Sequence, residues 1–137
     1  ITLPRLNICP SAGAGTITEE EMPVDFVRFK EEWLRSTLQV NPAYLKVLPV
    51  DGDSMEPTLR SGDIIVVDCR KPDHIKDGVY VIRHDGALKV KRLQGLGRGA
   101  IKITSDNPRY DSITIGPEEP PDEFAVCGRV VWAGRRM

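Results

Sequence analysis

The sequence has 137 residues, with 19 Lys and Arg against 20 Asp and Glu, which gives a formal net charge of −1. This length suits one domain with a single core, and the balanced charge argues against a nucleic-acid-binding surface. No apolar run approaches the roughly 18 residues that span a bilayer, so neither a membrane segment nor a signal peptide is expected.

The first predicted elements are a strand, a loop and a helix. Residues 1–8 alternate weakly between apolar and polar side chains, which favours a short strand, and the small residues of 9–16 favour a loop. We therefore treat 1–23 as an N-terminal strand and loop, followed by one domain over 24–137. Apolar side chains then recur at helical spacing and predict one short amphipathic helix over 28–38. These side chains are Phe26, Phe29, Trp33, Leu34 and Leu38.

From residue 44 onward the pattern is typical of short strands separated by turns. Asp85-Gly86 is a dipeptide favoured in type I′ hairpin turns. In the last strand, Phe124, Val126, Val130 and Trp132 share one parity, which predicts one core-facing side. The predicted fold is a mostly antiparallel β domain with one short N-terminal helix. The expected strands are 44–50, 63–68, 78–84, 87–93, 100–104, 113–115 and 124–132.

The three cysteines, Cys9, Cys69 and Cys127, are far apart and form no CxxC pair. Their odd number and spacing argue against a disulfide framework or a zinc site and suit a reducing compartment. We expect small buried or half-buried apolar residues at these positions, a cytoplasmic location, and neither a metal nor another cofactor.

Ser54 lies between two predicted strands, directly after an Asp-Gly turn and shortly before Pro57. Such a serine can cap a short helix that begins near the proline. The same position also suits a nucleophile, because backbone amides at a helix start point outward and can stabilise an oxyanion. The sequence alone leaves both readings open.

A serine nucleophile needs a base, and neither histidine is well placed. His74 lies in a polar loop and His84 beside a hairpin turn, so both are expected to be exposed. A lysine can serve if burial keeps it neutral, against an ordinary pKa of about 10.4. Lys89 and Lys91 share one face of a predicted strand, yet alternation alone predicts two ordinary solvated lysines.

A family resemblance changes this picture. The segment GDSMEPTLRSGDIIVVD, followed by GVYVIRHDGALKVKRL, resembles the signature of the LexA-like repressor and serine-peptidase family. SAGAG, FKEEWL, SDNPRY and GRVVW extend the similarity over most of the chain, and it is strongest to the C-terminal domain of prophage repressors. The resemblance implies the antiparallel β fold shared by LexA and signal peptidase.

The resemblance also implies a catalytic dyad. The serine of the GDSM motif is Ser54, the family's nucleophile, and the lysine of the VKRL motif is Lys91, its general base. Lys89 falls where the family does not require lysine and is left out. The backbone amides of Asp53 and Ser54 match the oxyanion hole.

The family's scissile Ala-Gly bond matches SAGAG in two ways. We favour Ala12-Gly13, with Ala14-Gly15 as the alternative, and a plain linker is the reading without the family. The implied function is RecA-stimulated self-cleavage of a phage-type transcriptional repressor in the SOS response. A homodimer is expected, with the RecA filament as trigger and operator DNA bound through an upstream helix-turn-helix outside this chain.

Three other readings remain at this stage. One is a dimerisation module that keeps the fold without cutting, and another is a UmuD-like protein that processes itself and then partners a DNA polymerase. The third is signal peptidase, which shares the Ser/Lys chemistry but needs a membrane anchor that the sequence does not show.

Overall fold

The computed structural model describes residues 2–6, 23–28, 30–118 and 124–135, and all structural statements below refer to these residues. Helical structure is short and lies before β3. The helical elements are α1 (Glu31–Trp33), the π-helical turn Leu34–Leu38 and the 3-10 turn Pro42–Tyr44. The strands are β1 (Thr2–Leu6), β2 (Pro23–Arg28), β3 (Leu45–Pro49), β4 (Ile64–Asp68), β5 (Gly78–His84), β6 (Ala87–Gly97), β7 (Ala100–Thr104), β8 (Ile113–Ile115) and β9 (Phe124–Gly134).

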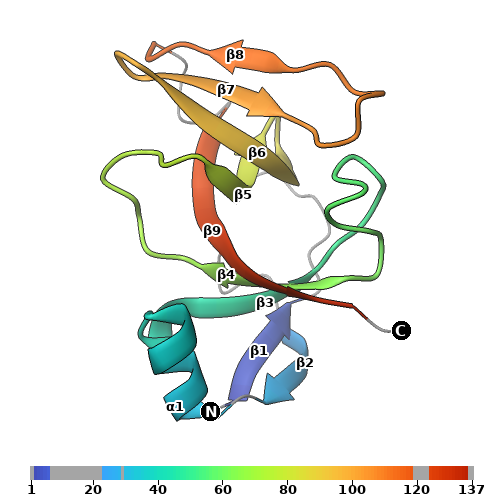
Figure 1. Ribbon diagram of the computed structural model, residues 1–137, viewed down its shortest axis with the longest axis vertical. Coiled ribbons are helices and arrows are strands. Elements are labelled where there is room, and N and C mark those ends of the chain that lie inside the picture. Colours follow the sequence, from blue (N-terminus) through green and yellow to red (C-terminus); the bar gives the residue numbers. More distant parts are fainter. Residues whose placement is uncertain (1, 7–22, 29, 119–123, 136–137) are drawn as a thin grey trace.

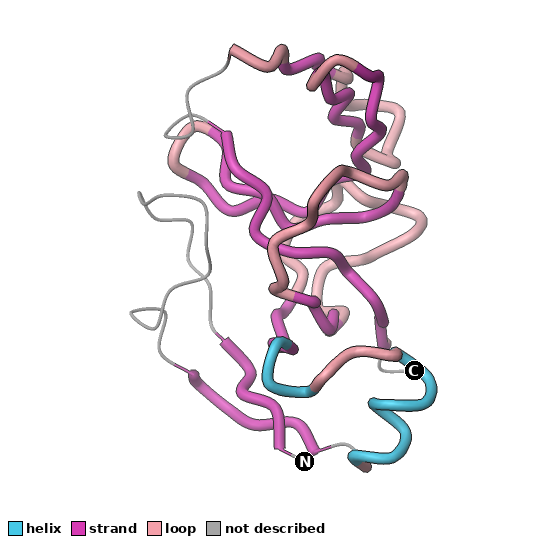
Figure 2. Tube along the Cα trace, turned by 90° about the vertical axis from the view of Figure 1, so that its left-hand side faces the viewer, coloured by secondary structure: helices cyan, strands magenta, loops and turns pink. Residues whose placement is uncertain are grey.

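The described strands form one strongly bent sheet in the order β2-β1-β3-β4-β9-β5-β6-β7-β8. All pairings are antiparallel except that of β1 with β3. The long strand β9 pairs with β4 along one part and with β5 along the other, so it joins the two halves of the sheet (Figure 1). Figure 2 shows β1, β2 and the helical segment at the same end of the molecule. The predicted antiparallel β class with one short helix is confirmed.

Most predicted strands are found within one or two residues of their expected ends. β5, β7 and β8 have the predicted bounds, whereas β6 and β9 continue further, to Gly97 and Gly134. Asp85 and Gly86 have φ angles of 52° and 77°, so both occupy the left-handed region that a type I′ turn requires. The predicted hairpin is confirmed.

The helix begins later than predicted, because the residues before it form a strand. Residues Pro23–Arg28 pair with β1, so Phe26 belongs to β2 and not to a helix. The helical turns cover only Glu31–Leu38, where Leu34 is fully buried and Trp33 meets Trp132 edge to face at 6.2 Å. Pairing with a neighbouring strand outweighed the helical spacing of the aromatic residues.

The four β9 side chains predicted to face the core all pack against apolar clusters, but the strand does not alternate regularly, because two bulges interrupt it. The register with β5 skips Cys127 and the register with β4 skips Val131. Each extra residue moves the following side chains to the other face. Accordingly Val126, Val130 and Trp132 pack against three different clusters.

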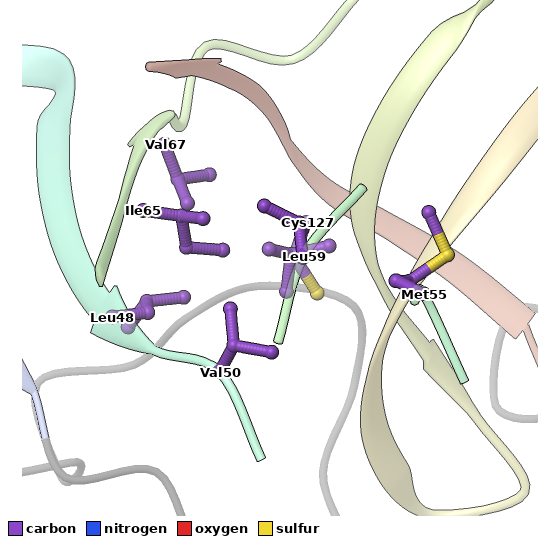
Figure 3. Packing of buried hydrophobic residues seen from close by; sticks show 8 residues of the cluster. Leu48, Val50, Met55, Leu59, Ile65, Val67 and Cys127 are labelled. Carbon is purple, nitrogen blue, oxygen red and sulfur yellow. The ribbon is translucent and has the colours of Figure 1, made fainter. Parts of the chain in front are cut away.

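One of these clusters lies beneath the segment that carries Ser54. Its members come from β3, β4, β5 and β9 and from the connection between β3 and β4 (Figure 3). Full burial of an aliphatic side chain contributes about 1.5–3 kcal/mol, so the cluster fixes this connection on the sheet. The buried residues are Leu48, Val50, Met55, Leu59, Ile65, Val67, Val81 and Cys127.

Two of the cysteines behave as small apolar residues, as predicted. Cys127 is buried and Cys69 is half-buried, where desolvation raises the pKa of its thiol to about 11. Cys9 lies outside the described residues. Within the described ranges, no helix is long and apolar enough to cross a membrane.

Candidate active site

Ser54 lies in the turn segment 51–59, which connects β3 with β4. The segment is a series of turns and not a helix, so the helix-cap reading of Ser54 is wrong. Two turn hydrogen bonds form within it, from the Glu56 amide to the Asp53 carbonyl at 3.1 Å and from the Leu59 amide to the Met55 carbonyl at 2.9 Å. The serine side chain is half-buried, at the edge of this turn segment.

Two apolar side chains anchor the turn segment. Met55, the residue after Ser54, is 2 % exposed and Leu59 is 3 % exposed, and both lie in the cluster beneath the segment. At the base of the connection, the Val50 amide donates to the Asp63 carbonyl at 2.8 Å. Buried anchors on a closed loop restrict where the serine hydroxyl can lie.

Lys91 lies on β6, and its side chain is half-buried. Nζ donates a hydrogen bond to Ser105 Oγ at 2.7 Å and lies 5.5 Å from the centroid of the Tyr110 ring. Burial lowers the pKa of Lys91, and the positive charge of Lys89 lowers it further. The alternating pattern predicted two solvated lysines, yet both are half-buried.

Ser54 and Lys91 line the same cavity, which has a volume of about 390 Å³. One wall comes from the end of β3 and the turn segment, and the opposite wall from β6. The walls are largely apolar, which favours the neutral form of an amine inside the cavity. The lining residues are Leu48, Pro49, Val50, Asp51, Gly52, Ser54, Met55, Val81, Leu88, Lys89, Val90, Lys91 and Tyr110.

The segment Ser105–Tyr110 binds the backbone around Ser54. The Asn107 amide donates to the Ser54 carbonyl at 2.9 Å, and Asn107 Nδ2 donates to the Asp53 carbonyl at 3.0 Å. The Tyr110 hydroxyl donates to the Asp53 carboxylate. The SDNPRY motif belongs to the family resemblance, but no role was predicted for these residues, although asparagine next to proline is a common signal for a turn.

The amides expected to form the oxyanion hole both lie in the turn segment. Among the described residues, neither the Asp53 amide nor the Ser54 amide donates a hydrogen bond. Ser54 lines the cavity, whereas Asp53 is not among its lining residues, and the oxyanion role of the two amides stays a prediction.

Neither histidine lines the cavity of Ser54 and Lys91. His74 is exposed, as predicted, and contributes to a separate hollow on the surface. His84 is half-buried and not exposed, because its ring packs edge to face against Phe124 at 6.3 Å. The described residues around the cavity thus offer lysine and not histidine as a base.

The edge of β6 beside Lys91 borders the same cavity. β7 pairs with β6 only from Arg92 to Gly97, so among the described strands Ala87–Lys91 pair with β5 alone. The two candidate scissile bonds, Ala12-Gly13 and Ala14-Gly15, lie outside the described residues.

The structure thus combines a bent, mostly antiparallel sheet with a cavity lined by a serine and a half-buried lysine. Residues 5–131 match the family model described as Peptidase S24-like, and the chain belongs to this family. It is 34 % identical over 125 residues to the HTH-type transcriptional regulator PrtR of Pseudomonas aeruginosa, covering 89 % of this chain and 48 % of that protein.

Two further relatives carry the name repressor. The 26 kDa repressor protein of Escherichia phage HK022 is 35 % identical over 119 residues, covering 83 % of this chain and 50 % of that protein. LexA repressor 2 of Pseudomonas syringae pv. tomato is 36 % identical over 95 residues, covering 69 % of this chain and 44 % of that protein. The chain thus spans about half the length of the curated relatives it matches. The predicted resemblance to LexA-like and prophage repressors is confirmed.

Proposed function

We propose that this chain is the C-terminal domain of a phage-type transcriptional repressor and that it cuts its own N-terminal segment with Ser54 and Lys91. The observation that carries the proposal is the shared cavity, in which the amine of Lys91 is half-buried beside the serine-bearing turn. A buried amine of lowered pKa is the form of lysine that can accept a proton from a hydroxyl group.

The reaction begins when Lys91 Nζ takes the proton of Ser54 Oγ as this oxygen attacks the carbonyl carbon of the scissile bond. The amides of Asp53 and Ser54 stabilise the oxyanion. The C–N bond then breaks, and the leaving amine receives the proton from Lys91, which leaves an ester on Ser54. A water molecule gives a proton to Lys91 and attacks the ester, which frees the new carboxylate and returns the proton to Ser54.

The proposed substrate is the Ala12-Gly13 bond of the same chain, with Ala14-Gly15 as the alternative. Small side chains let the backbone turn tightly, which brings the carbonyl within about 3 Å of the serine oxygen. Among the described strands, residues 87–91 pair on one side only, and this edge borders the cavity and suits an extended peptide. Because the substrate is tethered, its effective concentration is high.

Regulation follows from this tethering, because a permanently docked loop would be cut at once. We propose that the loop spends most of its time outside the cavity and that a RecA filament shifts this population. The domain also forms a homodimer, and an upstream helix-turn-helix binds operator DNA. Cleavage separates the two parts and weakens operator binding by loss of bivalency.

Fragment formation tests the proposal. The chain is incubated at alkaline pH, where Lys91 is neutral, and its products are separated by gel electrophoresis beside Ser54→Ala, Lys91→Ala and the control Lys102→Ala, which changes a β7 lysine outside the cavity. We expect two fragments from the parent and the control and none from the two site variants. A parent chain that stays intact while forming dimers would instead support a non-catalytic dimerisation module.

A further inference from the structure

Ser105 is the direct hydrogen-bond partner of the lysine amine. It follows β7 and is 7 % exposed, and its Oγ accepts from Lys91 Nζ at 2.7 Å. The register explains this meeting: Thr104 is opposite Arg92 on β6, so the next residues, Ser105 and Lys91, face each other. The contact thus lies one position beyond the last paired residues of β6 and β7 and continues their register.

A lysine at a cavity edge needs such a partner. Its four-carbon stem is free to rotate, and its ammonium group gains hydration by reaching toward water. Without an acceptor, no directional contact among the described residues would keep the amine of Lys91 from turning toward water. A hydrogen bond at 2.7 Å restricts the stem to the conformations that keep Nζ at Ser105 Oγ.

The chemical type of the partner matters as much as its position. A carboxylate in contact with Lys91 would stabilise the ammonium form and raise the pKa, which would disable a base. The nearby carboxylates are bound elsewhere: Asp106 accepts from Arg92, and Asp53 accepts from Tyr110. The group that holds the lysine is instead a neutral hydroxyl.

The other described groups around Lys91 do not form a directional hydrogen bond with its amine. Lys89, on the same face of β6, repels the ammonium form. The Tyr110 ring lies 5.5 Å away, too far for a directional hydrogen bond to its face. Asp51 lines the same cavity from the turn segment without a hydrogen bond to Lys91 among the described contacts. Ser105 is therefore the directional partner.

We infer that Ser105 is a positioning residue, which holds the amine of Lys91 inside the cavity through a neutral acceptor so that the lysine can lose its charge and still lie beside Ser54. This inference rests on the proposed self-cleavage. It assigns a role to a residue of the SDNPRY segment that the dyad alone does not include.

The kinetic test compares self-cleavage rates of the chain across the pH range with Ser105→Ala, Ser105→Thr and Ser105→Asp. The control is Ser112→Ala, which changes an exposed serine beyond the segment. Ser105→Ala should lower the limiting rate at high pH about 10- to 100-fold, because a neutral but misplaced amine cannot take the proton. Ser105→Thr keeps the hydroxyl and should restore most of the rate. Ser105→Asp should move the whole profile to higher pH.

A second readout does not depend on cleavage. The ¹³Cε signal of Lys91 is followed by NMR through a pH titration of Ser54→Ala alone and combined with Ser105→Ala. Loss of an acceptor for the ammonium form should move the Lys91 titration to lower pH.

The outcomes separate the two claims. An unchanged limiting rate in Ser105→Ala, with cleavage intact, would overturn the positioning role and leave the proposed function standing. A parent that never cleaves would remove the proposed function, and an unaltered Lys91 titration would overturn the positioning role in that case too.

Discussion

The carboxylate of Asp106 accepts two hydrogen bonds from the guanidinium of Arg92, both at 2.8 Å, and a third from the hydroxyl of Thr58. Arg92 directly follows Lys91 on β6, and Thr58 belongs to the turn segment that carries Ser54. Asp106 thus joins the strand of the lysine to the turn of the serine. The hydrogen bond from Arg92 is the main cause of the lowered pKa of Asp106, so its carboxylate is charged at neutral pH.

Replacing Asp106 should therefore loosen the site. We expect Asp106→Ala to lower the free energy of unfolding by about 1–2 kcal/mol, since it removes a bidentate but partly exposed ion pair. Cleavage should slow by more than this loss of stability explains, because the turn is no longer held against β6. Urea denaturation and cleavage rates measure the two effects. Asp111→Ala, at an exposed aspartate, should change neither.

The lowered pKa of Lys91 predicts how self-cleavage depends on pH. The base acts only when neutral, and its neutral fraction rises as the pH passes upward through its pKa. Because burial and Lys89 lower this pKa, the rate should begin to rise at a lower pH than an ordinary lysine would allow. Lys89→Gln removes a positive charge and should move the profile to higher pH. A rate that stays flat from about pH 7 to 10 would exclude a lysine base.

Gly128 provides a test of the fold at the crossing of β4 and β9. A Cβ atom there would lie 2.5 Å from Val67 Cγ1 and 2.7 Å from the carbonyl oxygen of Asp68. We expect Gly128→Ala to lower the free energy of unfolding by about 1–3 kcal/mol. At Gly116 a Cβ would meet no described atom within 4 Å, so Gly116→Ala is the matched control. If Gly128→Ala and the parent were equally stable in thermal unfolding, the close packing at Gly128 would be contradicted.

The ion pair of Asp63 and Arg135 predicts how stability depends on acid. Arg135 donates to the buried Asp63 carboxylate at 2.9 Å, and this hydrogen bond is the main reason why the pKa of Asp63 is lowered. A carboxyl group with a lowered pKa in the folded state stabilises the protein above its unfolded pKa of about 3.9, and this contribution is lost as the pH falls through the folded value.

Asp63→Asn should accordingly lower the free energy of unfolding at neutral pH by about 2 kcal/mol. The gap between parent and variant should narrow below about pH 4, as the parent loses its advantage. Urea denaturation at a series of pH values measures the gap. Asp73→Asn, at an exposed aspartate, should leave the free energy of unfolding unchanged at every pH. A gap independent of pH would show that the charge of Asp63 is not what stabilises the fold.

Local patterns predicted much of this fold. The β5–β6 hairpin is set by apolar residues on both sides of Asp85-Gly86, where both φ angles are positive, so its bounds were readable from the chain. β2 was not predicted, because Pro23 and Asp25 are poor strand residues and its pairing with β1 is not visible in the local pattern. The bulges of β9 also escaped prediction, because a bulge depends on the partner strand.

For the candidate site, too, local sequence patterns predicted only part of what the structure shows. Ser54 and Lys91 were assigned through family resemblance, whereas alternation alone predicted a solvated lysine. The hydrogen bond of Asn107 to the Asp53 carbonyl joins residues 54 positions apart, and that of Lys91 to Ser105 depends on the β6–β7 register. No local spacing reports such contacts. The sequence therefore identified residues 105–110 as a motif but did not predict which contacts they make.

Mass spectrometry of the products formed at alkaline pH is the decisive experiment for self-cleavage. We expect the 137-residue chain to yield a fragment ending at Ala12 or Ala14 together with its complement, and Ser54→Ala to yield neither. The same fragments from Ser54→Ala, or only the uncut mass from the parent at every pH, would contradict it.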